Sequence, residues 1–248
     1  MYLIGDIGNT DIKICIINNN NNIIKRINFL NNNLSLQKIN KNLNKLKIYL
    51  PKIEKILFCS VVPKSFRLIK RSLNNKTKIK CYETKNLDLS SIINIKVNYN
   101  QVGSDRLTNA ISLINNDKNY IIIDLGTATT FDVLIKNSYI GGIIAPGIKI
   151  SLNTLSDKAS LIPKINLKNT KKVIGIDTVS AVRSGFFWGY VGLIDNIIKL
   201  IKKEKRMSFK VVITGGFSEL IKNPLKTKVI VDKDITLKGL IKILKLIK

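Results

Sequence analysis

Short apolar runs in the first part of the chain alternate with polar, helix-like segments. The spacing of the apolar residues predicts three strands, a helix, a strand, a second helix and a last strand. In chain order these elements are Tyr2–Asp6, Asp11–Ile17, Ile23–Phe29, the helix-like Leu30–Leu50, Lys55–Val62, the helix Lys64–Leu73 and the strand Lys78–Glu83. Alternation of this kind is typical of an α/β half-domain.

The second half of the chain opens with the same pattern as the first. The stretch "NYIIIDLGTATTFDVLI" repeats the layout of "YLIGDIGNTDIKICII": an apolar strand, Asp-x-Gly, a polar turn and a second strand. Asp124 follows Asp6 at the same spacing as Gly126 follows Gly8, which is close to half the chain. A repeat at this offset predicts an internal duplication.

The duplication predicts an α/β protein of two lobes, residues 1–115 and 116–248, with a mixed sheet in each and a cleft between them. One polar turn from each lobe is expected to face the cleft. Farther on, a long helix is predicted at Thr178–Lys203, and Asp177 or Thr178 suits its N-cap.

The last residues, "TLKGLIKILKLIK", form a basic amphipathic helix. Such a helix either lies on a membrane surface or covers a sheet of its own protein. We expect the second arrangement.

Charge adds little to this picture. The chain has 42 Lys and Arg against 16 Asp and Glu, a formal charge of +26. A positive surface suits nucleic acid or membranes, but Asn, Lys and Ile are frequent along the whole chain, as coding bias would produce. No basic tract stands out, so we expect neither a nucleic-acid nor a membrane partner.

Other features of the composition exclude several classes of protein. The chain has no histidine, which excludes Ser-His-Asp and Cys-His catalysis and imidazole-dependent zinc sites. Its three cysteines form no disulfide pattern, no apolar run nears a membrane span, and no signal peptide is recognisable. We therefore expect a cytoplasmic protein.

The first polar turn, "DIGNT", has features that suit a nucleotide phosphate. Gly8 lets backbone N–H groups approach an anion, Asp6 could hold a cation such as Mg²⁺, and Lys13 follows three residues after the turn. Taken alone, this stretch could equally be an ordinary hairpin. The second turn, at Asp124, favours a pair of turns that bind one nucleotide, and "TGG" at Thr214 suggests close backbone packing against its adenosine.

A further candidate site lies in "VGSDRLTNAISLI", where apolar spacing predicts a helix that starts near Ser104 or Asp105. Asp105 would lie at the positive end of the helix dipole, which favours its ionised form. It could be a capping residue followed by a surface Arg106, or a general base beside an anion-binding arginine.

Taken together, these motifs resemble a known family. The ordered set DIGNT-x-x-K, GSDR, DLGTATT, GG-x-x-x-PG, TVSAVRSG and TGG, which runs from Asp6 to Gly216, is similar to the type III pantothenate kinases. That family belongs to the sugar kinase, Hsp70 and actin superfamily. The resemblance implies a duplicated ribonuclease H-like (actin-like ATPase) fold and ATP-dependent phosphorylation of pantothenate, the first step of coenzyme A synthesis.

The resemblance also implies roles for residues at matched positions. ATP phosphates would be lined by Asp6, Ile7, Gly8, Asn9, Thr10, Asp11, Ile12 and Lys13. Asp105 would accept the proton, and the remaining substrate contacts would be Tyr99, Gly103, Ser104, Arg106 and Thr178. Asp124 would bind a monovalent cation, K⁺ or NH₄⁺, and Thr127 would contact the nucleotide.

Two departures from the family pattern stand out. Ser104 occupies a position where alanine is expected, and the connection from Tyr99 to Gly103 is short and lacks a proline. The family further implies a homodimer through the helix that contains Gly185 and Gly189. Alternatives are an actin- or Hsp70-like ATPase, or an inactive basic regulatory protein on the same fold.

Overall fold

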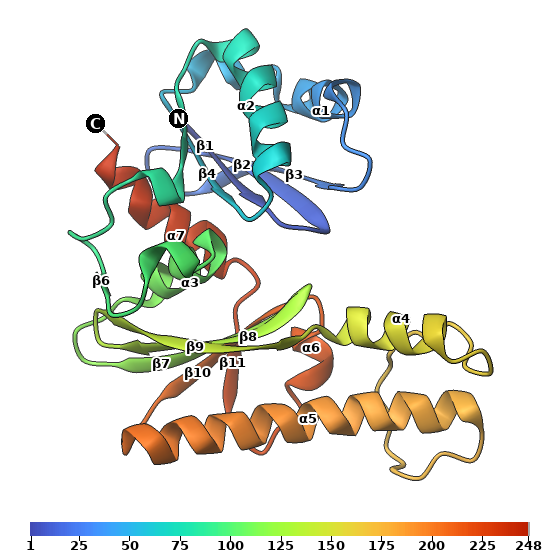
Figure 1. Cartoon of the computed structure of the whole chain (residues 1–248). Coiled ribbons are helices and arrows are strands. Elements are labelled where there is room, and N and C mark those ends of the chain that lie inside the picture. The colour runs from blue at the N-terminus through green and yellow to red at the C-terminus, as the bar shows by residue number, and fades with distance from the viewer. Residues whose placement is uncertain (248) are drawn as a thin grey trace. The chain divides into compact units, whose positions relative to one another are not determined.

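The computed structural model describes residues 1–247. The chain divides into two compact units (Figure 1). The first comprises residues 1–114 together with the segment from Asp234 onward, and the second comprises residues 115–233. Among the described residues, no helix combines the length and hydropathy needed to cross a bilayer.

The first unit contains a mixed sheet with the strand order β3-β2-β1-β4-β5. Its strands are β1 (Tyr2–Ile7), β2 (Asp11–Ile17), β3 (Ile23–Leu30), β4 (Lys55–Ser60) and β5 (Cys81–Glu83). The pairs β1–β2 and β2–β3 are antiparallel, while β1–β4 and β4–β5 are parallel. The strands predicted for this half of the chain are confirmed, with ends that differ by a few residues.

The remaining elements of the first unit are helices and short segments. Its helices are α1 (Leu36–Leu43), α2 (Pro63–Thr77), α3 (Ser104–Leu113) and α7 (Ile235–Ile243). Shorter elements are η1 (Asn44–Leu46), η2 (Leu50–Lys52), η3 (Thr84–Asn86), β6 (Asn94–Ile95), η4 (Tyr99–Gln101) and η5 (Leu244–Leu246). The helix-like stretch predicted at Leu30–Leu50 therefore contains one short α-helix and 3-10 turns.

The sheet of the first unit is buried on both faces. On one face Leu3 and Ile7 of β1 pack with Ile14 of β2 and with Ile39 and Ile69 of α1 and α2. Because side chains alternate along a strand, Ile4 and Asp6 point to the opposite face, and α3 and α7 cover that side through contacts with β4 and β1.

The C-terminal amphipathic helix, α7, docks on its own protein as predicted. Its apolar residues are buried: Ile235, Leu237, Leu240 and Ile243. Thr236 donates a hydrogen bond to Asn109 of α3 at 2.8 Å, and Asp234 pairs with Arg26 of β3 at 2.9 Å. The lobe predicted at residues 116–248 includes this helix, whereas the structure groups the helix with the first unit, because its apolar stripe packs on the first sheet.

The second unit repeats the strand arrangement of the first. Its strands are β7 (Asn119–Leu125), β8 (Ala128–Ile135), β9 (Ser138–Pro146), β10 (Lys210–Gly215) and β11 (Val229–Val231), in the order β9-β8-β7-β10-β11. As in the first unit, an antiparallel three-strand meander continues into parallel strands on the other side of its first strand. The matching order confirms the predicted duplication.

Three helices complete the second unit: α4 (Ile148–Lys158), α5 (Thr178–Lys205) and α6 (Ser218–Ile221). The apolar face of α5, including Phe187, Ile194 and Ile198, packs with Ile123 of β7 and Ile213 of β10. The predicted N-cap of α5 is confirmed at Asp177, which accepts a hydrogen bond from the Ser180 N–H at 2.8 Å.

Gly239 of α7 provides a test of the packing between α7 and α3. A Cβ at this position would overlap the Thr108 carbonyl oxygen, so Gly239→Ala should reduce the free energy of unfolding by about 1–3 kcal/mol. Gly192→Ala in α5 is the matched control, since a Cβ there would meet no atom within 4 Å. Urea denaturation should separate the two variants, and equal stabilities would contradict the close packing.

Candidate functional site

The turn of the first unit is a tight hairpin between β1 and β2. The Gly8 N–H donates to the Asp11 carbonyl at 2.9 Å, and Asp6 lies directly opposite Lys13 in the ladder. Ile7 and Ile12 are buried in the core, so only their backbone groups are available to a ligand. Of the predicted phosphate-binding residues, the exposed ones are Asn9, Thr10 and Asp11.

Two residues that the sequence analysis did not select hold this turn in place. Asn31 donates its side-chain amide to the Gly8 carbonyl at 2.6 Å, and its backbone N–H donates to the Thr10 carbonyl at 2.8 Å. Ser65 of α2 in turn donates to the Asn31 side-chain oxygen at 2.6 Å. Asn31 follows β3 directly, and its place after the third strand of a meander is the only signal that could have pointed to it.

Asp6 lies at the end of β1 in a partly buried position. Burial raises its pKa from 3.8 to about 6, Lys13 opposes this shift, and the charge of Asp105 adds to it. Asp105 is therefore close enough for its charge to affect Asp6. Cys59, the neighbour of Asp6 across the parallel ladder, is buried, and burial together with both carboxylates raises its pKa.

The N-terminus of α3 is attached to the end of β4 by Ser104. The Ser104 hydroxyl donates to the Ser60 carbonyl at 2.7 Å and accepts from the Ser60 N–H at 3.1 Å. An alanine at this position could make neither bond, so the serine gives this chain an additional connection between the strand and the helix. The buried Thr108 donates to the Ser104 carbonyl at 2.6 Å and continues the connection into the helix.

Asp105 occupies the first turn of α3, where its predicted position is confirmed. Its Oδ1 accepts a hydrogen bond from the Arg106 N–H at 2.8 Å. A Cβ on Gly103 would overlap this carboxylate, so the glycine leaves room for Asp105 to fold back over the helix start. Burial raises the pKa of Asp105, while the Arg106 N–H and guanidinium oppose the shift.

Tyr99 lies in the short η4 turn that precedes Gly103. Its hydroxyl donates to the Lys85 carbonyl at 2.9 Å, and the Lys85 ammonium lies 5.3 Å from its ring centroid. A cavity of about 440 Å³ adjoins Tyr99 and is otherwise lined by residues of the segment 87–95. The phenol oxygen can still accept a hydrogen bond from a ligand.

The turn of the second unit places its carboxylate between hydroxyl residues. Asp124 lies opposite Thr130 in the β7–β8 ladder and beside Thr214 in the parallel β7–β10 ladder. Residues that are paired on neighbouring strands point their side chains to the same face of the sheet. In the first unit the corresponding neighbours of Asp6 are a lysine and a cysteine, so the two related turns differ in chemistry.

Glycines allow other segments to approach the second turn. Gly147, before α4, lies so close that a Cβ would overlap the carbonyl oxygens of Gly126 and Thr127. Gly215, with φ +90°, lies against the backbone of Leu125. The "TGG" motif therefore packs directly on the strand that ends in this turn.

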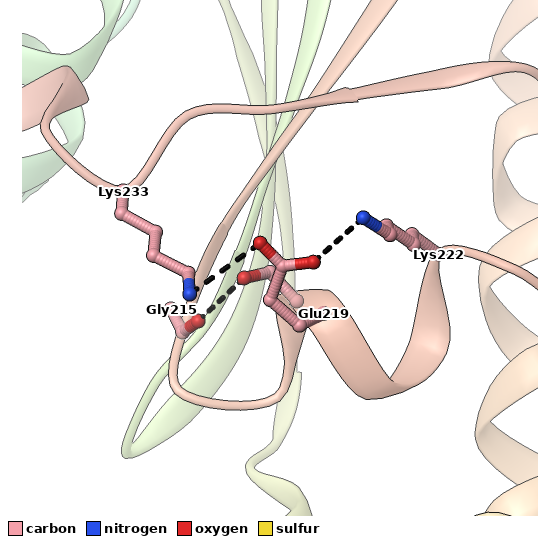
Figure 2. Close-up of polar contacts among 5 residues, drawn as sticks. Gly215, Glu219, Lys222 and Lys233 are labelled. Carbon is pink, nitrogen blue, oxygen red and sulfur yellow. Dashed lines mark hydrogen bonds and ion pairs between the residues drawn. The ribbon is translucent and has the colours of Figure 1, made fainter.

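Polar contacts hold the chain just after this glycine pair (Figure 2). The Ser218 hydroxyl donates to the Gly215 carbonyl at 2.8 Å. Glu219 pairs with Lys222 at 2.7 Å and with Lys233 at 3.4 Å. The Ser218 bond connects the start of α6 to the end of β10, and the Glu219–Lys233 pair connects α6 to the segment that follows β11.

The predicted residues thus fall into two groups. In the first unit, Asp6, Lys13 and Asp105 lie together, with Gly103, Ser104 and Arg106 at the start of α3. In the second unit, Asp124 and Thr127 belong to the β7–β8 turn, and Thr178 is exposed at the start of α5. The residues that sequence reasoning missed are Asn31, Cys59, Ser60, Ser65, Lys85, Thr130 and the role of Ser104.

The fold and these turns define a class: a duplicated α/β protein with the same fold as the actin-like sugar kinases. Among solved structures, a candidate 2-dehydro-3-deoxygalactonokinase from Sinorhizobium meliloti aligns with a TM-score of 0.63 at 9% identity, over 99% of this chain and 98% of the other. A Baf family protein from Campylobacter jejuni, described as a conserved candidate transcriptional activator, aligns with a TM-score of 0.57 at 21% identity, over 98% and 97%. At these identities the likeness concerns the fold alone.

Sequence comparison identifies the family. The model of the type III pantothenate kinases matches residues 2–200. A type III pantothenate kinase from Pelagibacter ubique is 62% identical over all 248 residues, and the alignment covers 100% of both chains. The chain belongs to the type III pantothenate kinase family, which confirms the resemblance seen in its motifs.

The raised pKa of Asp6 predicts a pH-dependent stability. Folded Asp6 binds its proton more tightly than unfolded Asp6, so stability falls as the pH rises from about 4 to about 6. The shift corresponds to a loss on the order of 3 kcal/mol. Asp6→Asn should therefore raise the melting temperature of the ligand-free protein above pH 6 and leave it unchanged near pH 4.

Melting curves between pH 4 and pH 8 measure this difference. Asp11→Asn, which alters an exposed carboxylate of the same hairpin, is the control. A difference between wild type and Asp6→Asn that is the same at every pH would show that Asp6 does not titrate in this range.

Proposed function

We propose that this protein transfers the γ-phosphoryl group of ATP to the terminal hydroxyl of pantothenate, the first step of coenzyme A synthesis. The observation that carries the proposal is the arrangement of Asp105 in the first unit. The carboxylate is folded over Gly103 at the start of α3, beside Asp6, in a position where burial raises its pKa. Family membership supports the choice of reaction and substrate.

Asp105 would act as the general base. Phosphoryl transfer needs a group that orients the attacking hydroxyl and accepts its proton. A raised pKa makes the carboxylate a stronger base, and the Arg106 N–H, bound to Oδ1, leaves the other carboxylate oxygen for the hydroxyl. Gly103, Ser104 and Arg106 would line the substrate on this side, with Tyr99 and Thr178 as further contacts.

The hairpin of the first unit would bind the phosphates of ATP and the accompanying Mg²⁺. Mg²⁺ is usually held by one or two carboxylates together with substrate phosphates, and Asp6 with Asp105 nearby fits that requirement. Within residues 1–247 no group of three or more His, Cys, Asp or Glu side chains is arranged so that it could hold a metal ion by itself. Lys13 and the backbone N–H groups near Gly8, Asn9 and Thr10 would stabilise the charge on the transferred phosphoryl group.

The turn of the second unit would bind a monovalent cation and contact the nucleotide. The argument for the cation is the oxygen-rich register of Asp124, Thr130 and Thr214, because hard cations prefer oxygen ligands. In the first unit, Lys13 supplies a positive charge at the position matched by Thr130. K⁺ or NH₄⁺ would supply the corresponding charge here, and Thr127 would contact the nucleotide.

A homodimer through α5 is also proposed. A Cβ at Gly185 or at Gly189 would meet no atom within 4 Å, so no other segment within residues 1–247 packs closely there. Large apolar residues just before α5 are exposed: Val173, Ile174 and Ile176. The cytoplasmic location and the expected absence of nucleic-acid and membrane partners stay predictions.

Asp105→Asn tests the general base. The amide keeps the size and the hydrogen bond to the Arg106 N–H but cannot accept the proton, so kcat should fall by at least about 100-fold. ATP consumption with and without pantothenate, in K⁺ buffer, measures this. Asp117→Asn, which alters an exposed carboxylate outside these motifs, should keep wild-type turnover. A variant that retains a tenth of wild-type kcat would rule out Asp105 as the base, and ATP consumption independent of pantothenate would favour an ATPase.

Asp124→Ala tests the cation site. Removal of the carboxylate should abolish activation by K⁺ over Na⁺ or raise the KM for ATP, because the oxygen cluster loses its charged member. Asp157→Ala, which removes an exposed carboxylate from α4, should behave like wild type. Rates measured across a K⁺ titration give the result, and unchanged K⁺ activation in Asp124→Ala would contradict the assignment.

A further inference from the structure

The turn that contains Tyr99 contains neither a proline nor a glycine. Its internal bonds are local: the Gln101 N–H donates to the Asn98 carbonyl at 3.1 Å, and the Val102 N–H donates to the Tyr99 carbonyl at 3.3 Å. The Asn98 side chain accepts from the Asn100 N–H at 3.1 Å. These bonds shape the turn but do not attach it to the rest of the unit.

Lys85 makes the attachment. Its carbonyl accepts the hydrogen bond from the Tyr99 hydroxyl at 2.9 Å, and its ammonium donates to the Asn100 carbonyl at 3.0 Å. The same ammonium lies over the Tyr99 ring at 5.3 Å from the centroid, within the range of a cation–π interaction. Among the described residues, both hydrogen bonds that leave residues 98–102 for another segment end on Lys85.

Lys85 is itself held at the end of the sheet. Its backbone N–H donates to Glu83 Oε2 at 2.9 Å, and Glu83 is the last residue of β5. The next residue, Thr84, is fully buried and donates to the Phe58 carbonyl at 3.1 Å. Lys85 thus lies at the carboxyl edge of the parallel strands, the same edge that carries Asp6 at the end of β1.

We propose that Lys85 is a positioning residue for the phosphoryl acceptor: it fixes the Tyr99 turn relative to Asp105. This inference rests on the proposed function, since Tyr99 and Asp105 are the expected substrate contacts. The turn leads directly through Gly103 into α3, so movement of the turn changes how Tyr99 faces the acceptor. A fixed turn binds its substrate without losing conformational freedom at that moment.

The variant Lys85→Met tests whether Lys85 positions the Tyr99 turn. Methionine keeps the length of the side chain and the backbone carbonyl, and removes the ring contact and the bond to Asn100. The KM for pantothenate should rise about tenfold, which corresponds to about 1.4 kcal/mol. The KM for ATP should stay within about twofold and the melting temperature within about 2 °C. Lys85→Arg should restore most of the affinity, because a guanidinium can make both contacts.

Lys80→Met is the matched control. The Lys80 ammonium lies over the Tyr82 ring at 4.9 Å, so the variant removes a similar contact near the same strand without touching the turn. Its kinetics should equal those of wild type. Amide hydrogen exchange of residues 98–103 in the ligand-free protein should be faster in Lys85→Met than in wild type or Lys80→Met, and this measurement does not depend on activity.

Each result decides the matter. An unchanged KM for pantothenate in Lys85→Met overturns the proposal, and so does unchanged exchange of residues 98–103. An increase in both KM values with a lower melting temperature would show a general structural role and overturn it as well. If wild-type protein does not phosphorylate pantothenate, the proposed function fails on its own, while hydrogen exchange still decides whether Lys85 holds the turn.

Discussion

The structure depends on keeping two carboxylates close together at the edge of a buried sheet. Burial removes solvation from both Asp6 and Asp105, and the charge of Asp105 adds a smaller repulsion, which is why the pKa of Asp6 rises to about 6 although Lys13 opposes the shift. The fold holds them in place through polar neighbours: the Lys13 cation opposite Asp6, and the Ser104 hydroxyl that joins α3 to the end of β4. Ligand cations would relieve the repulsion that the ligand-free protein retains.

Duplication has produced two related hairpins with different chemistry. Both begin with an aspartate at the end of a central strand, and both lie in a sheet of the same strand order. Asp6 faces a lysine, whereas Asp124 lies between two threonines. The same backbone can therefore serve a turn with its own positive charge and a turn that suits a bound cation.

The connection between β5 and α3 shows how a short segment without proline is held in place. The short segment from Tyr99 to Gly103 has no proline, and among the described residues both hydrogen bonds that leave residues 98–102 for another segment end on Lys85. A hydrogen bond, a ring contact and a carbonyl acceptor on one residue hold this segment without the fixed φ of a proline. Ser104 acts in a similar way one residue after Gly103, by bonding Ser60 where an alanine would leave both groups unpaired.

The chain's own pattern was enough to predict most strands, the start of α3 at Ser104, the N-cap of α5 at Asp177, the duplication and the family, because these depend on local spacing and on motifs of consecutive residues. Contacts between distant segments could not be read in this way. The apolar stripe of α7 requires burial but does not indicate on which sheet the helix will pack. Asn31, Lys85 and Thr130 are brought to the site only by strand register and loop packing. Side-chain neighbours across a sheet are set by how the chain folds back on itself, and no short stretch of residues contains that information.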